Sequence, residues 1–348
     1  MTLPDAVAAV LWLGVTAYAL LGGADFGAGF WDLVAGGAHR GKQQRALIEH
    51  SIGPVWEANH VWLIFVLVVM WTAFPGLFGA VSSTLWIPLT IAAFGVIARG
   101  SAFAFRKNVT ALWQRQAFGA AFAASSVVTP YFLGAAAGAV ASGRVPPGIG
   151  TGNAVTSWWN PVSDLTGALA VVVCAYLAAV YLTADARRSG DQELIAQFRA
   201  RALVAGVAAG IIAVAGIAVL HADAPALSTG LTHRALPLVI ISAAAGIIAL
   251  GLLYLRLFLT ARIVAALAVT AVIWGWAVAQ YPYVLQSRLT ISAAAATHSV
   301  LVAVLVSMAA GAVLLVPSLL WLYLIFQRTE LPAGRDVAAG AGRARASG

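Results

Sequence analysis

Residues 235–255 read ALPLVIISAAAGIIALGLLYL, a run without charged residues that lies between Arg234 and Arg256. A helix of roughly 20 apolar residues is long enough to cross the hydrocarbon core of a bilayer. Because unpaired backbone groups are costly in hydrocarbon, such a run is expected to fold as a helix. The run therefore predicts a membrane-spanning helix, and the same criterion applies to the rest of the chain.

Nine apolar runs meet this criterion. They cover residues 6–31, 54–74, 79–102, 116–140, 162–183, 202–220, 235–255, 263–283 and 299–326. The composition agrees, since 61% of the 348 residues are hydrophobic, only 9% are charged, and the mean hydropathy is +0.91. A soluble domain carries about 25% charged residues. The sequence thus predicts an all-α polytopic membrane protein with nine transmembrane helices in a single domain, residues 1–327.

Several classes of protein are excluded at this point. Cys174 is the single cysteine, so the chain has no disulfide and no zinc or iron–sulfur cluster held by cysteines alone. The net charge of +8 does not indicate nucleic-acid binding, because the basic residues fall in short clusters between apolar runs. The first run lacks a charged segment and a cleavage site before it, which favours a retained helix over a removed signal peptide.

The distribution of basic residues predicts the orientation. If the N-terminus is outside, the outer loops hold only Arg144, Arg234 and Arg288, and Arg99 lies near a helix end. The inner loops then carry the other basic residues, namely Arg40, Lys42, Arg45, Arg106, Lys107, Arg115, Arg187, Arg188, Arg199, Arg201, Arg256, Arg262, Arg328, Arg335, Arg343 and Arg345. Cytoplasmic loops are enriched in Lys and Arg. We therefore expect an external N-terminus and a cytoplasmic C-terminus.

Three segments outside the spans are long enough to interpret. The outer loop 141–161 contains the pair Trp158-Trp159, which suits an anchor at the membrane interface. The inner loop 184–201 is charged and is a candidate for a short surface helix. The cytoplasmic tail 328–348 is rich in Gly, Ala and Arg and is predicted to be disordered.

The first span contains two acidic residues in its second half. Asp25 lies among small residues, in GGADFGAG at 22–29, and Asp32 follows seven residues later on about the same helix face. A charge at the centre of a bilayer costs about 2.5–3.5 kcal/mol on insertion scales, so each one needs a reason. The alternative is that both acids simply end the helix at the inner membrane surface.

The second span begins with the densest polar cluster in the chain, EHSIGPVWEANHVW at residues 49–62. Glu57, His60 and Trp56 are spaced to share one helix face, which Asn59 and Trp62 flank. A carboxylate beside an imidazole in a dry site is suited to proton relay. The same residues also fit a polar cluster that packs two helices together. Two candidate ligands are too few to predict a metal site.

Other titratable residues are open to more than one interpretation. Arg99 ends the third span and can extend to the inner surface or turn inward to pair with Asp25 or Glu57. His221, Asp223 and His233 are expected in solvated loops. His298, at the start of the last span, is a candidate for haem ligation, although no cleft is apparent.

Taken together, these motifs resemble subunit II of the cytochrome bd quinol oxidase. The resemblance is carried by GADFGAG at 23–29, IGPVWEANHVWLI at 52–64, Arg99-Gly100 and Phe105-Arg106-Lys107. It is specific over the first hundred residues, and beyond them it depends on length, span count and patches such as Trp159-Asn160-Pro161. The family has Asp or Glu where Glu57 stands, and Gln is also found where His60 stands.

The resemblance implies a heterodimer with a homologous subunit I in a bacterial cell membrane. The complex would oxidise quinol and reduce dioxygen to water, building a proton gradient without pumping. Haems b and d would belong to subunit I, and this chain would bind no haem and no metal. The fold would contain two four-helix bundles and one peripheral helix. Some members carry a structural quinone in subunit II, and small accessory subunits are a further implied kind of partner.

The resemblance also implies roles for single residues. Glu57, Asp25, His60 and Asn59 would form a proton pathway. Trp56 and Arg99 would belong to a quinone site or to a structural polar cluster. Trp62 would lie near a lateral apolar opening for dioxygen, or it is an ordinary core or lipid-facing tryptophan.

Two other functions remain open at this stage. A proton-coupled transporter would also have nine spans and intramembrane acids, but the Gly-interrupted first span has no matching partner in the second half, as inverted repeats would require. A pure scaffold for subunit I is the third interpretation. The sequence has no Walker loop, no GxSxG and no zincin motif, so hydrolase or nucleotide chemistry has no support.

Overall fold

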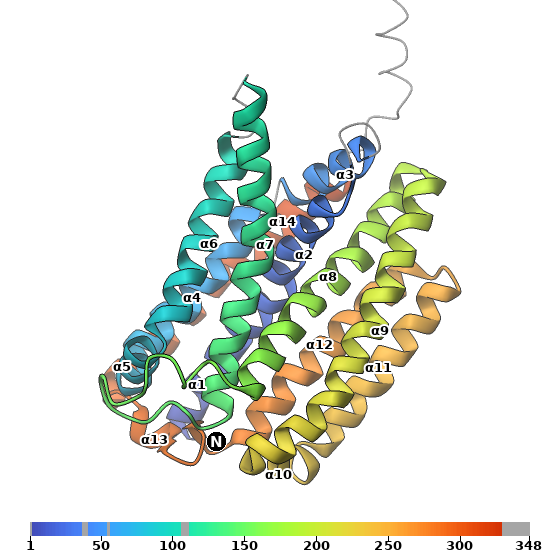
Figure 1. Ribbon diagram of the computed structural model, residues 1–348. Helices are drawn as coiled ribbons and strands as arrows, with labels where there is room; N and C mark the ends of the chain where they lie inside the picture. The colour runs from blue at the N-terminus through green and yellow to red at the C-terminus, as the bar shows by residue number, and fades with distance from the viewer. Residues whose placement is uncertain (1, 37–40, 54–55, 106–110, 329–348) are drawn as a thin grey trace, which may run out of the picture.

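The fold is almost entirely helical (Figure 1). The structure is a computed structural model that describes residues 2–36, 41–53, 56–105 and 111–328. In chain order, the elements are α1 (Leu3–Ala17), the π-helix η1 (Tyr18–Gly22), α2 (Gly23–Leu33), α3 (Lys42–Ile52), α4 (Trp56–Ala73), α5 (Pro75–Thr84), α6 (Trp86–Phe105), α7 (Leu112–Ala141), α8 (Pro161–Ser189), α9 (Gln192–Asp223), α10 (Pro225–Thr232), α11 (Leu236–Tyr254), α12 (Phe258–Gln280), β1 (Tyr283–Leu285), β2 (Leu289–Thr290), α13 (Ile291–Ala294) and α14 (His298–Arg328). Arg40, Pro54, Arg106, Lys107 and the predicted disordered tail from residue 329 onward lie outside the described residues.

The described part of the chain contains nine helices that are long and apolar enough to span a membrane, which agrees with the predicted number. The helices run roughly side by side, so the molecule has two ends (Figure 1). We call the end that carries α3 and the α8–α9 turn the α3 end, and the end that carries the N-terminus, α5 and α10 the α10 end. Along the chain, α6 packs on α7, α7 on α8, α8 on α9 and α11 on α12, while α2 lies against both α7 and α8.

The last helix stands apart from this packing. α14 packs mainly against α1 and α4. Residues 309–318 of α14 are all exposed. A helix that is apolar on every side and barely covered by its own chain is expected to face lipid or another subunit.

The first span differs from a regular helix. α1, η1 and α2 follow one another without a break, and together they form one span, Leu3–Leu33. The π-helical turn η1 has a wider backbone than the α-helices on either side, and such turns are frequent at functional sites. Asp25 lies in the first turn of α2, directly after η1.

Two predicted boundaries are wrong. The run 79–102 is not one helix, because α5 ends at Thr84 and α6 begins at Trp86. Pro88 lies in the first turn of α6, where its missing N–H does no harm, and this position fits a new helix start at Trp86.

The loop predicted at 184–201 is also largely absent, since α8 and α9 extend through it to Ser189 and from Gln192. The turn consists of Gly190, whose φ of 71° suits glycine, and Asp191, whose carboxylate accepts from the N–H groups of Glu193 and Leu194 at 3.0 and 3.1 Å.

The α10 end contains elements that the apolar runs do not reveal. α12 ends at Gln280, before the predicted 283, and a short antiparallel hairpin of β1 and β2 follows. The loop after α7 is irregular, as predicted. In that loop, Trp159 is 66% exposed, whereas Trp158 packs on Phe132 with ring centroids 5.6 Å apart.

Small residues allow close contact between spans at Gly27, Gly29 and Gly95. A side chain at Gly27 would collide with the backbone of Cys174 on α8, and side chains at Gly29 and Gly95 would collide with hydroxyls on α7. Ala93 is exposed, and a Cβ at Gly22 would meet only the ring of Tyr18 in the same span.

Candidate functional site

The candidate site lies where α2, α4, α6 and α7 meet. Its centre is the guanidinium of Arg99 on α6, which is only 2% exposed. Nη2 donates a hydrogen bond to the main-chain oxygen of Asp25 at 2.5 Å, and Nη1 donates to Oγ of Ser126 on α7. Arg99 therefore turns inward, so of its two predicted orientations the one toward the membrane surface is wrong.

Aromatic rings surround this guanidinium. The Arg99 Cζ atom lies 5.0 Å from the ring centroid of Phe26 and 4.4 Å from that of Phe122. A desolvated cation over an aromatic face gains about 2 kcal/mol or more. Hydrogen bonds on two sides and neighbouring aromatic rings offset the desolvation cost of the buried Arg99 charge inside a membrane-spanning bundle.

Asp25 is buried in the same cluster. Its Oδ2 accepts a hydrogen bond from Nδ2 of Asn59 on α4 at 2.8 Å. The Arg99 guanidinium also contacts Asp25, and its hydrogen bond goes to the main-chain oxygen. Asp25 is therefore an intramembrane acid held by a neutral amide, and it does not end a helix at the surface.

Asp32 has a different environment, at the end of α2. Its Oδ1 lies 3.0 Å from Nε of Arg45, and the same arginine donates through Nη2 to the Gly36 carbonyl at 2.6 Å. These contacts tie the end of α2 to α3. Asp32 therefore fits the helix-ending interpretation and lies outside the Asp25 cluster.

His60 and Trp56 border the cluster on α4. Nδ1 of His60 lies 3.1 Å from the Trp56 carbonyl oxygen. The His60 ring is surrounded by Phe26, Tyr18 and Trp56, with centroids 5.6, 6.1 and 6.1 Å away. Trp56 in turn packs on Phe103 at 5.3 Å.

Glu57 and Trp62 are not brought into this cluster. Asn59 points inward, and Glu57 lies on the exposed side of α4. Trp62 is half-buried and packs on Phe65, with centroids 5.7 Å apart. The structure thus gathers Asp25, Asn59 and Arg99, whereas the predicted polar face of α4 is divided between the interior and the exterior.

Sequence reasoning missed two residues of the site, Ser126 and Phe122. Both lie on α7, four residues apart on one face, and both are buried. The pair Ser125-Ser126 in the middle of an apolar run was an available signal, because hydroxyls in spanning helices commonly bind across to other helices. No charge marks α7 at this point.

The described residues show where candidate ligands for a haem or a metal lie. They include no group of three or more His, Cys, Asp or Glu that could hold a metal ion. His50, His221, His233 and His298 are exposed. The remaining described histidine is His60, whose ring is enclosed by aromatic side chains. We therefore derive no step through a haem ligated here.

Comparison with known proteins identifies the fold and the family. The solved structure of bd oxidase from Geobacillus thermodenitrificans contains a chain that matches with a TM-score of 0.73 and 26% identity, over 94% of this chain and 99% of that one. The nine spans and this match define the class, a helical membrane protein with the fold of a bd oxidase subunit. The family described as cytochrome bd terminal oxidase subunit II matches residues 3–326, so the chain belongs to that family.

Curated relatives agree with this assignment. The cytochrome bd ubiquinol oxidase subunit 2 of Bacillus subtilis is 28% identical over 216 residues, which are 62% of this chain and 62% of the relative. The cytochrome bd-I ubiquinol oxidase subunit 2 of Escherichia coli K12 is 27% identical over 212 residues, 59% of this chain and 54% of the relative. The chain thus spans less than two thirds of these relatives in the matched regions.

Proposed function

We propose that this chain is the haem-free subunit II of a cytochrome bd-type quinol oxidase in a bacterial cell membrane. It would pair with a haem-bearing subunit I, which would oxidise quinol and reduce dioxygen to water with haems b and d. The N-terminus would be external and the C-terminus cytoplasmic. Two bundles, one from the spans before α8 and one from α8, α9, α11 and α12, would pack beside the peripheral α14.

The exposed face of α4 carries this proposal. Glu57 is followed by four exposed apolar residues, Val61, Ile64, Val68 and Trp71, spaced by four, three, four and three residues. This spacing puts all five on one stripe, which is the pattern that packs against a partner helix. A carboxylate in the first turn of a membrane span is stabilised when protein covers it, because the lipid alternative is costly. The stripe therefore suits the contact with subunit I.

In this arrangement Glu57 would pass protons to subunit I, and Asp25, Asn59 and His60 would form the polar path behind it. Reducing dioxygen to water consumes protons, so a haem buried in the bilayer needs a polar route from one membrane surface. Basic residues at the α3 end, such as Arg45 and Lys42, make the entrance positive, and carboxylates there would help to collect protons.

The other roles follow from burial. Because both terminal nitrogens of Arg99 are occupied within the chain, Arg99 would belong to a structural polar cluster, with Trp56 at its edge. A structural quinone, if this oxidase carries one, would contact Trp56. Small accessory subunits are further candidates to cover exposed helices such as α14.

The change Glu57→Gln tests the proton role. The amide keeps the shape and hydrogen bonding of the side chain but cannot release a proton, so quinol-driven oxygen consumption should fall at least tenfold. Haem content of the purified complex should stay normal. Glu193→Gln is the matched control, since Glu193 also lies exposed in the first turn of a span, at the same end. Full activity of Glu57→Gln would reduce this chain to a scaffold.

Trp62 is proposed to line a lateral route for dioxygen. Replacing Trp62 with Ala removes a half-buried ring, so the apparent affinity of the oxidase for oxygen should change while haem content does not. Trp113→Ala is the control, because Trp113 is an exposed tryptophan on α7, outside the stripe on α4. An unchanged oxygen dependence in Trp62→Ala would assign Trp62 to packing alone.

A further inference from the structure

The orientation of Arg99 depends on two helices at once. One terminal nitrogen is bound to the main chain of α2 at Asp25, and the other is bound to Ser126 on α7. The main-chain oxygen is fixed by the helix to which it belongs. Ser126 is therefore the side-chain contact that decides where the second half of the guanidinium lies.

Ser126 is held in place for this contact. It is 1% exposed, and its Oγ donates to the Phe122 carbonyl at 2.6 Å, which leaves the oxygen lone pairs to accept from Arg99. Gly29 on α2 makes the approach possible. A Cβ at Gly29 would collide with Ser126 Oγ and would lie only 2.7 Å from Nη1 of Arg99.

We propose that Ser126 is a positioning residue: by holding Nη1 of Arg99, it fixes the guanidinium against α2 and so tunes how firmly Asp25 retains its proton. This inference rests on the proposed function, in which Asp25 belongs to the proton path. Ser126 would regulate the proton affinity of Asp25 through Arg99, without contacting the Asp25 carboxylate.

The other groups that act on Asp25 or Arg99 come from several elements. Tyr18 on η1 and Cys174 on α8 interact electrostatically with Asp25 or Arg99, and His60 on α4 and Asp32 on α2 interact with Arg99. Asn59 contributes a neutral hydrogen bond. Asp32 is paired with Arg45, and Arg99 carries the permanent positive charge next to Asp25. Moving its guanidinium therefore changes the field at Asp25 more than a rearrangement of a neutral neighbour would.

The change Ser126→Ala removes the acceptor without adding volume. Nη1 then loses its partner on α7, and the guanidinium can tilt away from its place against α2. A nearby positive charge favours the ionised carboxylate, so weakening it lets Asp25 keep its proton to higher pH. The pH dependence of the oxidase should then move toward alkaline pH by about half a unit or more.

Ser125→Ala supplies a matched control. Ser125 is also buried on α7, and its Oγ also donates to the Phe122 carbonyl, at 3.0 Å, but Ser125 has no hydrogen bond to Arg99. Each variant loses one serine hydroxyl from α7, and both hydroxyls donate to the Phe122 carbonyl. Their difference isolates the contact with Arg99.

The experiment uses the intact oxidase complex with both serine variants and Asp25→Asn. Two readouts are recorded, the pH profile of quinol-driven oxygen consumption and an infrared titration of the Asp25 carboxyl band, which Asp25→Asn identifies by its loss. We expect Ser126→Ala to shift both readouts to higher pH, with haem content unchanged, and Ser125→Ala to shift neither.

Two outcomes overturn the inference. If neither serine variant moves the carboxyl band, Ser126 does not act on Asp25. If both variants move it equally, loss of packing in α7 explains the shift. Failure of the proposed function is distinguishable, because Asp25→Asn would then keep full oxygen consumption whatever the infrared titration of Ser126→Ala shows.

Discussion

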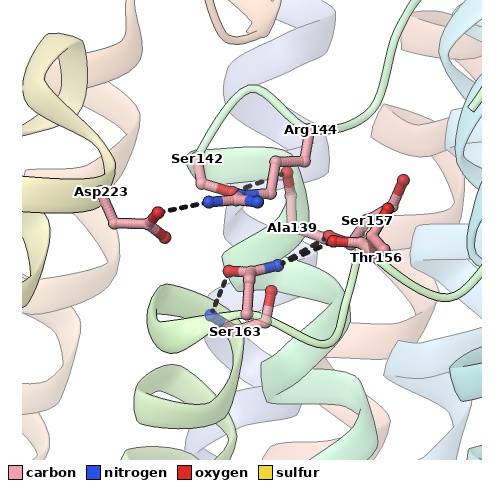
Figure 2. Close-up of polar contacts among 8 residues, drawn as sticks. Ala139, Ser142, Arg144, Thr156, Ser157, Ser163 and Asp223 are labelled. Atoms are coloured by element: carbon pink, nitrogen blue, oxygen red, sulfur yellow. Dashed lines mark hydrogen bonds and ion pairs between the residues drawn. The ribbon is translucent and has the colours of Figure 1, made fainter. Parts of the chain in front are cut away.

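Two of the places where an arginine contacts an aspartate are built differently. At the α10 end, Arg144 from the loop after α7 forms a direct ion pair with the carboxylate of Asp223, the last residue of α9 (Figure 2). Their side chains are 34% and 21% exposed. Inside the bundle, Arg99 is almost fully buried and donates to the main chain of Asp25, while the Asp25 carboxylate is held by Asn59.

The Arg144–Asp223 pair holds a loop in place, whereas the contact between Arg99 and Asp25 leaves the carboxylate outside the pairing. A direct ion pair uses the carboxylate as an anchor, and around Arg144 the loop is further fastened by Ser142, which donates to the Ala139 carbonyl, and by Asn160, which caps α8 by accepting from the Ser163 N–H (Figure 2). In the buried pair the arginine is anchored without occupying the carboxylate. In the proposed function, the Asp25 carboxyl group is therefore left to exchange a proton.

Loss of the buried arginine should have the largest effect. Arg99→Leu removes the charge that acts on Asp25 and leaves Ser126 and the Asp25 main-chain oxygen without their donor. Breaking a buried pair in this way costs about 3–5 kcal/mol. We expect a strong drop in thermal stability and in yield of the assembled complex, measured by haem-containing protein after purification.

Arg99→Lys sharpens this test, because it keeps the charge but cannot reach in two directions with a planar group. It should recover assembly only in part. Full stability of Arg99→Leu would mean that the buried cluster contributes little to the fold.

Asp25→Asn compared with Asp223→Asn should give the next largest effect. The first change keeps a partner for Asn59 but removes the exchangeable proton, so oxygen consumption should fall at least tenfold with normal haem content. The second change affects only the fastening pair, and activity should stay near that of the unchanged protein. Equal losses in the two variants would contradict the division between the two regions.

Arg144→Met should have the smallest effect. A partly exposed ion pair contributes about 1 kcal/mol or less and weakens as salt is added. We therefore expect a slight loss of thermal stability, and an even smaller difference from the unchanged protein at high salt. A large loss that persists at high salt would show that the pair behaves as a buried one.

The sequence predicts the parts of this molecule that depend on hydrophobicity. Each of the nine apolar runs corresponds to a span, because the period and length of such runs are local properties. The small residues at Gly27 and Gly29 also predict close helix contacts. The end of α8 at Ser189 was not predicted, because the charged residues of its last turns resemble a loop in composition. The end of α5 at Thr84 was not predicted, because the short break after it is as apolar as the helices on either side.

The candidate site was predicted only in part. Asp25 and Arg99 were found, since a charge in a span is conspicuous. Their arrangement depends on how α2, α6 and α7 meet, and no local spacing gives that. Spacing on α4 put Glu57 and His60 on one face but did not tell which side of the helix faces its own chain, and Asn59 proved to be the residue that points to Asp25.

The π-helical turn η1 separates the first span into two halves, so the side-chain directions around the helix axis in one half are not set by those in the other. In a regular α-helix, each residue advances the direction of the side chain by about 100°, so inserting or deleting one residue turns everything beyond it. A π turn accommodates one extra residue locally. The segment Leu3–Ala17 can thus be aligned to its own neighbours while Gly23–Leu33 keeps Asp25 facing Asn59. Deleting a residue from Tyr18–Gly22 would convert the first span into a helix of uniform pitch in which only one of these two alignments survives.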